Sequence, residues 1–459
     1  MDNARPLFAP QSPDMRQLRG VIDGEVITPA DAAWDEARRA WNLTVDQQPA
    51  AVAIPESAAD VRQIVDFARE EGLRVAPQGT GHGAAALGSL DETILVKLHR
   101  LRGVEIDPER RSARVEAGVI WVEVVEAAAE HGLAALSGSS PDVGVVGYTL
   151  GGGLSWLARK HGIGTNQVTA IELVTADGRL RRVDRDNDPD LFWALRGGGG
   201  AFGIVTAIEF NLVPLESVYA GHLFFPVERA AEVLKAWRDW TETVPDEITS
   251  VGRILQLPPI EEIPEPFRGN SFAVLQAIYC GDDVQEAARL LEPLRALGPA
   301  IDTFDVIPMP ALSHLHMDPE QPTAGLADGS TLESLSNATV DAFVGAVVGT
   351  PILAAELRHL GGAVARPRPE HGALAAFDAP YVAFAVGMIP FPGARARLAE
   401  AMHGFMTAIE PWLAGHTYLN FAEGRRDPRT LWTEAAYHRL RRIKVTVDPH
   451  DVIRSNHPL

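Results

Sequence analysis

Apolar residues in the first half of the chain recur with two spacings, which predict strands alternating with helices. Helical spacing is expected over 30–41, 57–71, 120–130 and 154–161, and Ser57 and Gly72 can begin and end the second of these helices. Strand-like runs stand at 49–54, 73–76, 93–97, 103–106, 112–116, 171–175, 179–183 and 204–212. This mixture predicts an α+β domain over residues 19–215, preceded by a loosely ordered terminus at 1–18.

The pattern changes after residue 216, which predicts a second domain over 216–415. Strand-like runs at 218–225, 271–279 and 380–388 alternate there with helical stretches at 227–242, 284–296 and 394–413. Prolines, glycines and serines over 308–335 predict a long loop, either a binding loop or a disordered segment.

Composition and charge exclude several classes of partner. The chain has 459 residues, enough for more than one core, with 61 acidic against 41 basic side chains. A formal charge of -20 argues against nucleic acid or an anionic membrane as partner. No apolar run reaches the roughly 18 residues of a membrane span, and the N-terminus does not resemble a secretory signal. We therefore expect a cytoplasmic protein.

Cysteine and histidine usage gives no indication of a disulfide or a metal site. The single cysteine, Cys280, ends an apolar run and is expected to be a buried hydrophobe rather than a nucleophile. No cluster of cysteines and histidines has metal-ligand spacing, so no metal is expected.

Two glycine-rich stretches carry the candidate chemistry. A backbone without Cβ atoms can turn sharply and point its N–H groups at an anion. Neither stretch has the spacing of the dinucleotide fingerprint or of a phosphate loop. We interpret them as two walls around an extended, phosphate-bearing cofactor: residues 75–84, with Gly79, Gly81 and Gly83 around His82, and residues 139–153, with Gly144, Gly147, Gly151, Gly152 and Gly153.

The order of the motifs resembles a known family. The glycine-rich stretches are followed by Asn166, by the segments 170–175 and 188–206, and near the C-terminus by 418–421 and 440–449. In this order they are similar to the berberine bridge enzyme-like branch of the FAD-linked oxidases related to vanillyl-alcohol oxidase. The resemblance runs from about residue 41 to residue 458. It implies a PCMH-type FAD-binding domain, an antiparallel-sheet substrate domain, and a segment at 416–459 that returns to the FAD domain.

The resemblance places His82 where the family bonds a histidine covalently to the ring methyl group of FAD. An imidazole nitrogen can add to this methyl group when it is electrophilic, which tethers the cofactor and raises its oxidising power. Some members add a cysteine link from the second stretch, but Ser140 occupies that position and cannot form a thioether. A single covalent link is therefore expected. Val143 lies where a small side chain leaves dioxygen a path, or it is simply a packing residue.

Tyr418 and Asn420 are the expected catalytic residues. In a strand, side chains two residues apart lie on the same face, so one could meet the substrate and the other the flavin. By resemblance the tyrosine removes or holds a substrate hydroxyl proton while hydride passes to the ring. A base near neutral pH would need its pKa lowered from about 10. A packed core tyrosine is the alternative.

Further FAD contacts are implied by the resemblance from both glycine-rich stretches, the strand after 203 and the terminal segment. They are Gly79, Thr80, Gly81, His82, Gly83, Ala84, Ser139, Ser140, Val143, Gly144, Gly147, Tyr148, Gly151, Gly152, Gly153, Leu154, Asn166, Gly203, Ile204, Val205, Asn420, Asn456 and His457.

The expected function is that of an FAD-dependent oxidase. It would take a hydride from an alcohol or related C–H centre of a small organic molecule, a secondary metabolite or a sugar, and reduce dioxygen to hydrogen peroxide. The alternatives are a dehydrogenase with another electron acceptor, a flavin-binding protein without turnover, and a protein whose glycine-rich loops hold a different nucleotide. The oligomeric state stays open.

Overall fold

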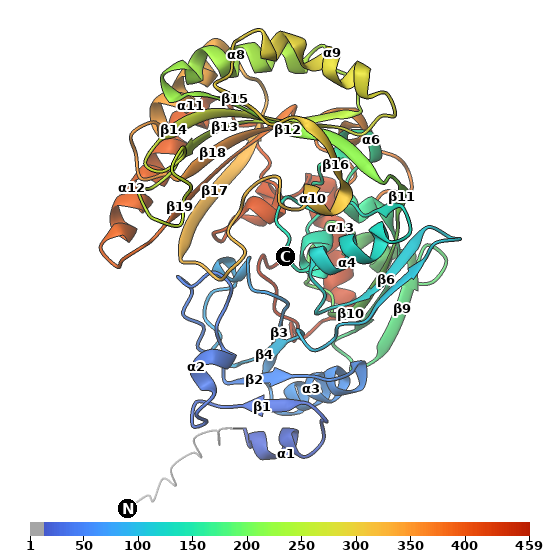
Figure 1. The fold of residues 1–459 in the computed structure, drawn as a ribbon. Helices are drawn as coiled ribbons and strands as arrows, with labels where there is room; N and C mark the ends of the chain where they lie inside the picture. Colours follow the sequence, from blue (N-terminus) through green and yellow to red (C-terminus); the bar gives the residue numbers. More distant parts are fainter. Residues whose placement is uncertain (1–12) are drawn as a thin grey trace, which may run out of the picture.

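Two layered regions face one another in the computed structural model, which describes residues 13–459 (Figure 1). The first half of the chain builds two separate sheets, and the second half builds one large sheet with helices on its outer face. The last segment, red in Figure 1, lies back among the elements of the first region. This arrangement confirms the α+β class and the antiparallel sheet expected in the second half of the chain.

A small sheet in the order β1-β2-β4-β3 begins the first region. Helix α3 (Ala58–Glu70) connects β2 to β3, and the Ser57 side chain caps it by accepting the N–H of Asp60. Strand β3 ends at Gln78, so the first glycine-rich loop starts at the carboxyl end of a parallel pair, where ligands of α/β sheets bind. The strands are β1 (Glu25–Ile27), β2 (Ala51–Ile54), β3 (Arg74–Gln78) and β4 (Thr93–Lys97).

A second, antiparallel sheet follows in the order β5-β6-β10-β8-β9. Its strands are β5 (Val104–Asp107), β6 (Ser112–Glu116), β8 (Val168–Val174), β9 (Leu180–Asp184) and β10 (Ile204–Asn211). A separate pair joins β7 (Leu133–Ala134) to β11 (Val213–Pro214). The helices of this part are α4 (Trp121–Ala129), α5 (Val145–Leu150), α6 (Ala158–His161) and α7 (Pro189–Leu195), with 3-10 turns at η1 (Ala84–Ala86) and η2 (Gly164–Gln167).

The large sheet runs β15-β12-β14-β13-β18-β19-β17, with β16 paired beside β12, and every pair in it is antiparallel. Helices α8 (Ala230–Thr241), α9 (Val284–Arg295), α11 (Asn337–Val347) and α12 (Ala394–Ile409) cover its outer face (Figure 1). The strands are β12 (Ser217–Pro226), β13 (Ile248–Gln256), β14 (Ser271–Tyr279), β15 (Ile301–Asp302), β16 (Asp305–Pro308), β17 (Gly325–Leu332), β18 (Ala354–His359) and β19 (Tyr381–Met388). Its inner face is left for the first region.

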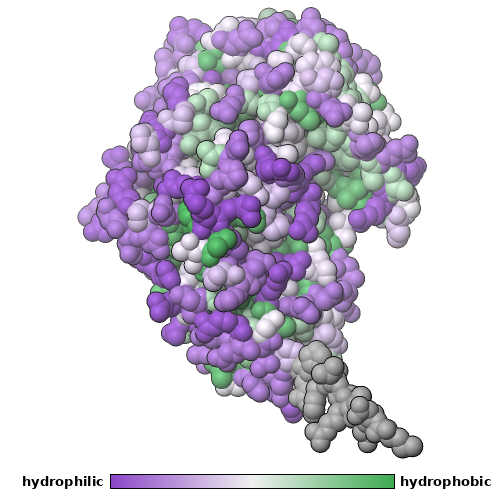
Figure 2. Space-filling view, turned by 180° about the vertical axis from the view of Figure 1, so that it is seen from behind, coloured by the Kyte–Doolittle hydropathy of each residue, from purple (hydrophilic) through white to green (hydrophobic). Residues whose placement is uncertain are grey.

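Burial and surface character agree with the sequence analysis in two respects. Cys280 is buried and free, and burial raises the pKa of its thiol to about 11, which suits a packing residue. The face in Figure 2 is mostly hydrophilic, with hydrophobic residues scattered in small groups. Within residues 13–459, every helix is too short or too polar to cross a bilayer.

Two predicted helices are shorter in the structure than their apolar spacing indicates. Over 30–41 only α2 (Trp34–Ala37) is helical, because the Asp31 carboxylate accepts the N–H and hydroxyl of Thr28 and holds a turn there. Over 154–161 only α6, the last turn, is helical, and the N–H groups of Gly153 and Leu154 before it are bound by a distant side chain.

Two predicted loose segments are partly ordered. The loop expected over 308–335 contains α10 (Met309–Leu312) and the edge strand β17, which pairs with β19 along its whole length. A ladder of backbone bonds does not require an apolar side-chain pattern, so this strand gave no periodic signal. The terminus expected to be loose through residue 18 includes α1 (Met15–Arg19), where Leu18 is fully buried; residues 1–12 lie outside the described residues.

The terminal segment closes the first region from behind. Helix α13 (Glu434–Val447) is followed by a stretch that pairs with β3: Val75 donates to the Val452 carbonyl at 2.9 Å and accepts from Arg454 at 2.8 Å. A buried ion pair between Lys444 and Asp448, 2.5 Å apart, fixes the turn between these elements. Asp448 also accepts the N–H groups of Val452 and Ile453, which belong to the stretch paired with β3. The strand that leads to the first glycine-rich loop is therefore supported by the end of the chain.

Asp448→Ala should lower the free energy of unfolding by about 3 kcal/mol, because it leaves the buried Lys444 ammonium with only the more exposed Asp451 carboxylate, 3.3 Å away, as counter-charge. Urea unfolding of the variant measures this loss. Asp341→Ala, which removes the partner of Lys235 in an exposed pair, is the matched control and should change stability much less. Equal effects of the two substitutions would contradict the anchoring role.

Candidate active site

The two glycine-rich loops lie side by side. A Cβ atom on Gly144 would stand 3.8 Å from the Thr80 side chain and 3.9 Å from its backbone nitrogen. A Cβ on Gly147 would meet nothing within 4 Å, and one on Gly79 would come no closer than 3.9 Å to another atom. Open space therefore adjoins Gly79, Gly144 and Gly147, as a cradle for an extended ligand requires.

Two glycines are required by backbone geometry. Gly81 has φ +92°, and a Cβ there would lie 3.0 Å from the Trp41 nitrogen. Gly153 has φ +89°, and a Cβ there would lie 2.6 Å from the Tyr148 ring. Side chains rarely adopt such φ values, so the turns that aim both loops depend on these residues.

His82 is held on three sides. Trp41 stacks on its ring with centroids 4.1 Å apart and planes inclined by 20°. Its Nδ1 lies 2.7 Å from the Thr80 hydroxyl, and its Nε2 lies 3.6 Å from the Asp142 carboxylate of the second loop. About 25% of the side chain stays exposed, so the imidazole is both oriented and accessible.

The terminal segment reaches the first loop. The Asn456 side chain donates to the Gly83 carbonyl at 2.7 Å. His457 is buried, and its Nε2 lies 3.1 Å from the Ala422 carbonyl. Burial lowers the pKa of His457 to about 4 in spite of that hydrogen bond, so the ring is neutral near pH 7. Asn456 therefore binds the loop that carries His82, whereas His457 binds the stretch after Tyr418.

Tyr418 and Asn420 lie together, but not on a strand. Tyr418 precedes the 3-10 turn η6 (Leu419–Phe421), and its oxygen accepts the N–H groups of Gly153 and Leu154, each at 3.0 Å. Asn420 donates to the same oxygen at 2.8 Å and to the Tyr148 carbonyl at 2.9 Å. The pair therefore binds the second loop.

The lowered pKa that a tyrosine base would need is not found. Tyr418 is 3% exposed, and burial raises the pKa of its phenol to about 12. The three N–H donors and the Arg358 guanidinium act in the opposite direction but do not outweigh burial. The phenol is thus protonated near neutral pH, in a site whose donors would hold a phenolate.

A group of buried charges that the sequence analysis missed joins the substrate sheet to the second loop. Arg358 and Glu356 lie two residues apart on β18, with their charged atoms 2.6 Å apart, and Glu356 also meets His316 at 2.7 Å. Arg358 donates to Ser139 at 3.1 Å, and the hydroxyl of Ser140 donates to Asp318. Alternating charged and apolar residues in a buried strand were the available signal.

Electrostatics keeps the Glu356 carboxyl ionised. Burial opposes ionisation of Glu356, yet Arg358 and His316 hold the pKa of its carboxyl well below the usual range. Arg358 also lies 5.1 Å from the ring centre of Phe421, which stacks on Phe384 at 4.3 Å. Charged and aromatic side chains therefore gather beside Tyr418, between the two regions.

Several expected FAD residues have structural partners of their own. Asn166 accepts the N–H of Gly372 and donates to the Leu374 carbonyl, so it holds a loop of the second region. The side chains of Ile204 and Val205 are buried in the core beside β8, next to Gly203. Any contact of these four residues with FAD stays a prediction, as it does for the half-buried Val143.

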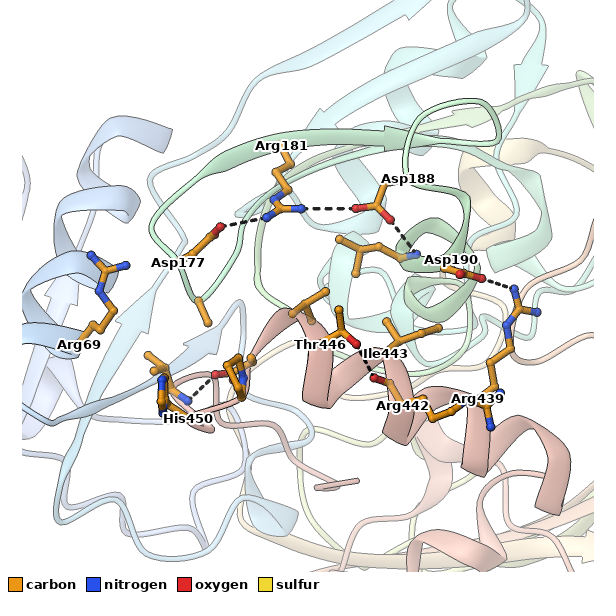
Figure 3. A pocket seen from close by; sticks show the side chains of 16 residues that line it. Arg69, Asp177, Arg181, Asp188, Asp190, Arg439, Arg442, Ile443, Thr446 and His450 are labelled. Carbon is orange, nitrogen blue, oxygen red and sulfur yellow. Dashed lines mark hydrogen bonds and ion pairs between the residues drawn. The ribbon is translucent and has the colours of Figure 1, made fainter.

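A cavity of about 730 Å³ lies elsewhere, between α7, α13 and the turn before β9 (Figure 3). Its charges pair with one another: Arg181 with Asp177 at 2.9 Å and with Asp188 at 3.5 Å, and Arg439 with Asp190 at 2.7 Å. None of the expected cofactor or catalytic residues lines it. We therefore place the candidate site at the glycine-rich loops.

Known proteins are similar to this chain in sequence and fold. Residues 49–184 match the family model described as FAD binding domain. YgaK of Bacillus subtilis, an uncharacterized FAD-linked oxidoreductase, is 28% identical over 94% of this chain and 96% of its own length. (R)-6-hydroxynicotine oxidase of Paenarthrobacter nicotinovorans is 37% identical over 42% of each chain. The solved structure of BBE-like 1 from Physcomitrella patens shares the fold, with TM-score 0.83, 20% identity and coverage of 96% of this chain and 97% of its own.

Glu423, five residues after Tyr418, should make stability depend on pH. Burial raises the pKa of its carboxyl from 4.5 to about 7, and the neighbouring Asp328 adds to the rise. The native state therefore binds the proton more tightly than the unfolded chain, so stability falls as pH rises from about 4.5 to about 7. Glu423→Gln should unfold at a higher temperature than the wild type at pH 8 and at the same temperature at pH 4.5.

Thermal unfolding followed by circular dichroism measures both values. The control is Glu333→Gln, at an exposed position, whose effect should be equal at the two pH values. A Glu423→Gln variant with the same difference from the wild type at pH 4.5 and pH 8 would contradict the raised pKa.

Proposed function

We propose that this chain, which belongs to the FAD-linked oxidoreductases of the berberine bridge enzyme-like type, is an oxidase that takes a hydride from a small organic molecule and reduces dioxygen. The observation that carries the proposal is the position of His82. It stands between Trp41, Thr80 and Asp142, where the two glycine-rich loops meet. The name of the 37% identical relative, an oxidase of 6-hydroxynicotine, supports dioxygen as the acceptor.

The residues around the glycine-rich loops fit FAD. When bound, FAD supplies an acceptor for hydride and a donor of electrons to dioxygen. Gly79, Gly144 and Gly147 leave room for its extended chain, and glycine N–H groups suit its phosphates. His82 would hold the ring through one covalent bond, since Ser140 cannot form the second.

The remaining machinery would handle the substrate proton. We assign its removal to Tyr418, whose phenolate would be held by the N–H groups of Gly153 and Leu154 and by the Asn420 side chain. Arg358 adds a positive charge nearby.

The substrate class follows from the side chains at this boundary. Stacked Phe384 and Phe421, with Arg358 over the latter, suit a compact hydroxyl-bearing secondary metabolite with an unsaturated or aromatic ring. A mono- or oligosaccharide is the second choice. The small side chain of Val143 favours dioxygen over another electron acceptor. If this side chain instead blocks the route of dioxygen to the flavin, a dehydrogenase is the alternative.

The purified protein should be yellow, and its acid-precipitated pellet should keep the colour. The intact mass should exceed the chain mass by one FAD. His82→Ala should bind FAD and release it to the supernatant, because the only nitrogen assigned to the covalent bond is gone. A wild-type pellet that loses its colour would contradict the covalent link. A protein that stays colourless with added FAD would contradict FAD as the cofactor.

Tyr418→Phe should slow the reduction of the flavin by substrate about 100-fold or more, the usual size of a general-base contribution. Stopped-flow absorbance measures this step. If Tyr418 acts as the base, the wild-type rate should rise about tenfold per pH unit below its pKa of about 12. The variant should lack this dependence.

Tyr437→Phe, which removes the hydroxyl of a partly exposed tyrosine on α13, is the matched control and should reduce normally. A Tyr418→Phe variant with the wild-type rate would assign the residue to packing. If no candidate alcohol reduces the flavin of the wild type, the chain is better described as a flavin-binding protein without turnover.

A further inference from the structure

Asp142 has an unusual environment for a surface-loop carboxylate. Only 15% of its side chain is exposed. Its Oδ2 accepts the indole N–H of Trp41 and lies 3.6 Å from Nε2 of His82, while its Oδ1 is buried without a hydrogen-bond partner among residues 13–459. A buried carboxylate oxygen without a partner is costly, and its presence beside a reactive histidine indicates a role in that histidine's chemistry.

The neighbours of His82 select one form of the ring. The carboxylate of Asp142 can only accept a proton, so a hydrogen on Nε2 suits that side of the imidazole. The hydroxyl of Thr80, 2.7 Å from Nδ1, can then donate to the lone pair there. Trp41 keeps the ring plane fixed by stacking and holds the same carboxylate through its N–H. Nδ1 is therefore the nucleophilic nitrogen.

We propose that Asp142 is the positioning residue that promotes formation of the covalent bond between His82 and FAD. This inference rests on the proposed function, because it presupposes that the bond forms. In the step, Nδ1 of His82 bonds to the carbon of the ring methyl group, which loses one hydrogen as a proton. The electron pair of that C–H bond passes into the flavin ring, and the Nε2 proton passes to Asp142. Dioxygen then takes the two electrons and two protons as hydrogen peroxide.

The charge of Asp142 matters most while the new bond forms. The imidazole becomes cationic as Nδ1 is alkylated, until Nε2 gives up its proton. A carboxylate within 4 Å, in a site partly screened from water, stabilises that cation. Trp41 contributes by orienting the carboxylate, and it carries no charge of its own.

The test follows bond formation rather than turnover. The full-length wild type, Asp142→Asn and Asp142→Glu are produced under riboflavin limitation and incubated with FAD. Intact mass then gives the linked fraction over time, and absorbance gives the total FAD bound. Asp142→Asn should bind as much FAD as the wild type but link it at least about tenfold more slowly, since it lacks the charge near the imidazole. Asp142→Glu should restore part of the rate.

Asparagine keeps the size of Asp142 and can still accept an N–H, so a purely structural role would leave the linking rate unchanged. Asp186→Asn, at an exposed position before α7, is the matched control and should link at the wild-type rate. If the wild type gains no mass, the covalent link of the proposed function fails. If the wild type links and Asp142→Asn links equally fast, or no longer takes up FAD, the inference about Asp142 alone is overturned.

Discussion

One oxygen atom holds the candidate site together. The phenol oxygen of Tyr418 accepts the N–H groups of Gly153 and Leu154, which are 265 and 264 residues away in sequence. These bonds hold the end of the second glycine-rich loop, and the stretch that follows it is helical only from Ala158. The close approach of Asn420 to Gly151, whose Cβ would lie 1.8 Å from the amide oxygen, belongs to the same contact. The turn of this loop and the placement of the terminal segment therefore depend on each other.

The first glycine-rich loop depends on the end of the chain in a similar way. The backbone of Val75 pairs with the stretch after α13, and Asn456 binds the carbonyl of Gly83. The buried pair of Lys444 and Asp448 supports that stretch. Both loops are thus fixed by residues from the last 42 positions, 418–459, which explains why a segment so far along the chain belongs to the first region.

Hydrogen bonds to charged side chains join the second glycine-rich loop to the second region of the chain. The adjacent Ser139 and Ser140 each bind a charged residue of the second region, Arg358 and Asp318. Glu356 and His316 lie between these two charges. The second glycine-rich loop is consequently held against the large sheet by hydrogen bonds and ion pairs. The same charges lie next to Tyr418, the proposed catalytic tyrosine.

His82 as the candidate link came from the resemblance to a known family. The sequence by itself determined the α+β class, most strands and helices, and the two glycine-rich loops. These follow from local causes: periodic apolar burial, a capping residue such as Ser57, and the absence of Cβ atoms at turns. Only the tertiary structure decided that residues 154–157 are not helical, that 325–332 form an edge strand, and that Glu356, Arg358 and Asp142 belong to the site. Each of these outcomes rests on a partner distant in the chain, and the pKa of Tyr418 rests on burial. No local pattern records which distant groups will meet, or how far their meeting excludes water.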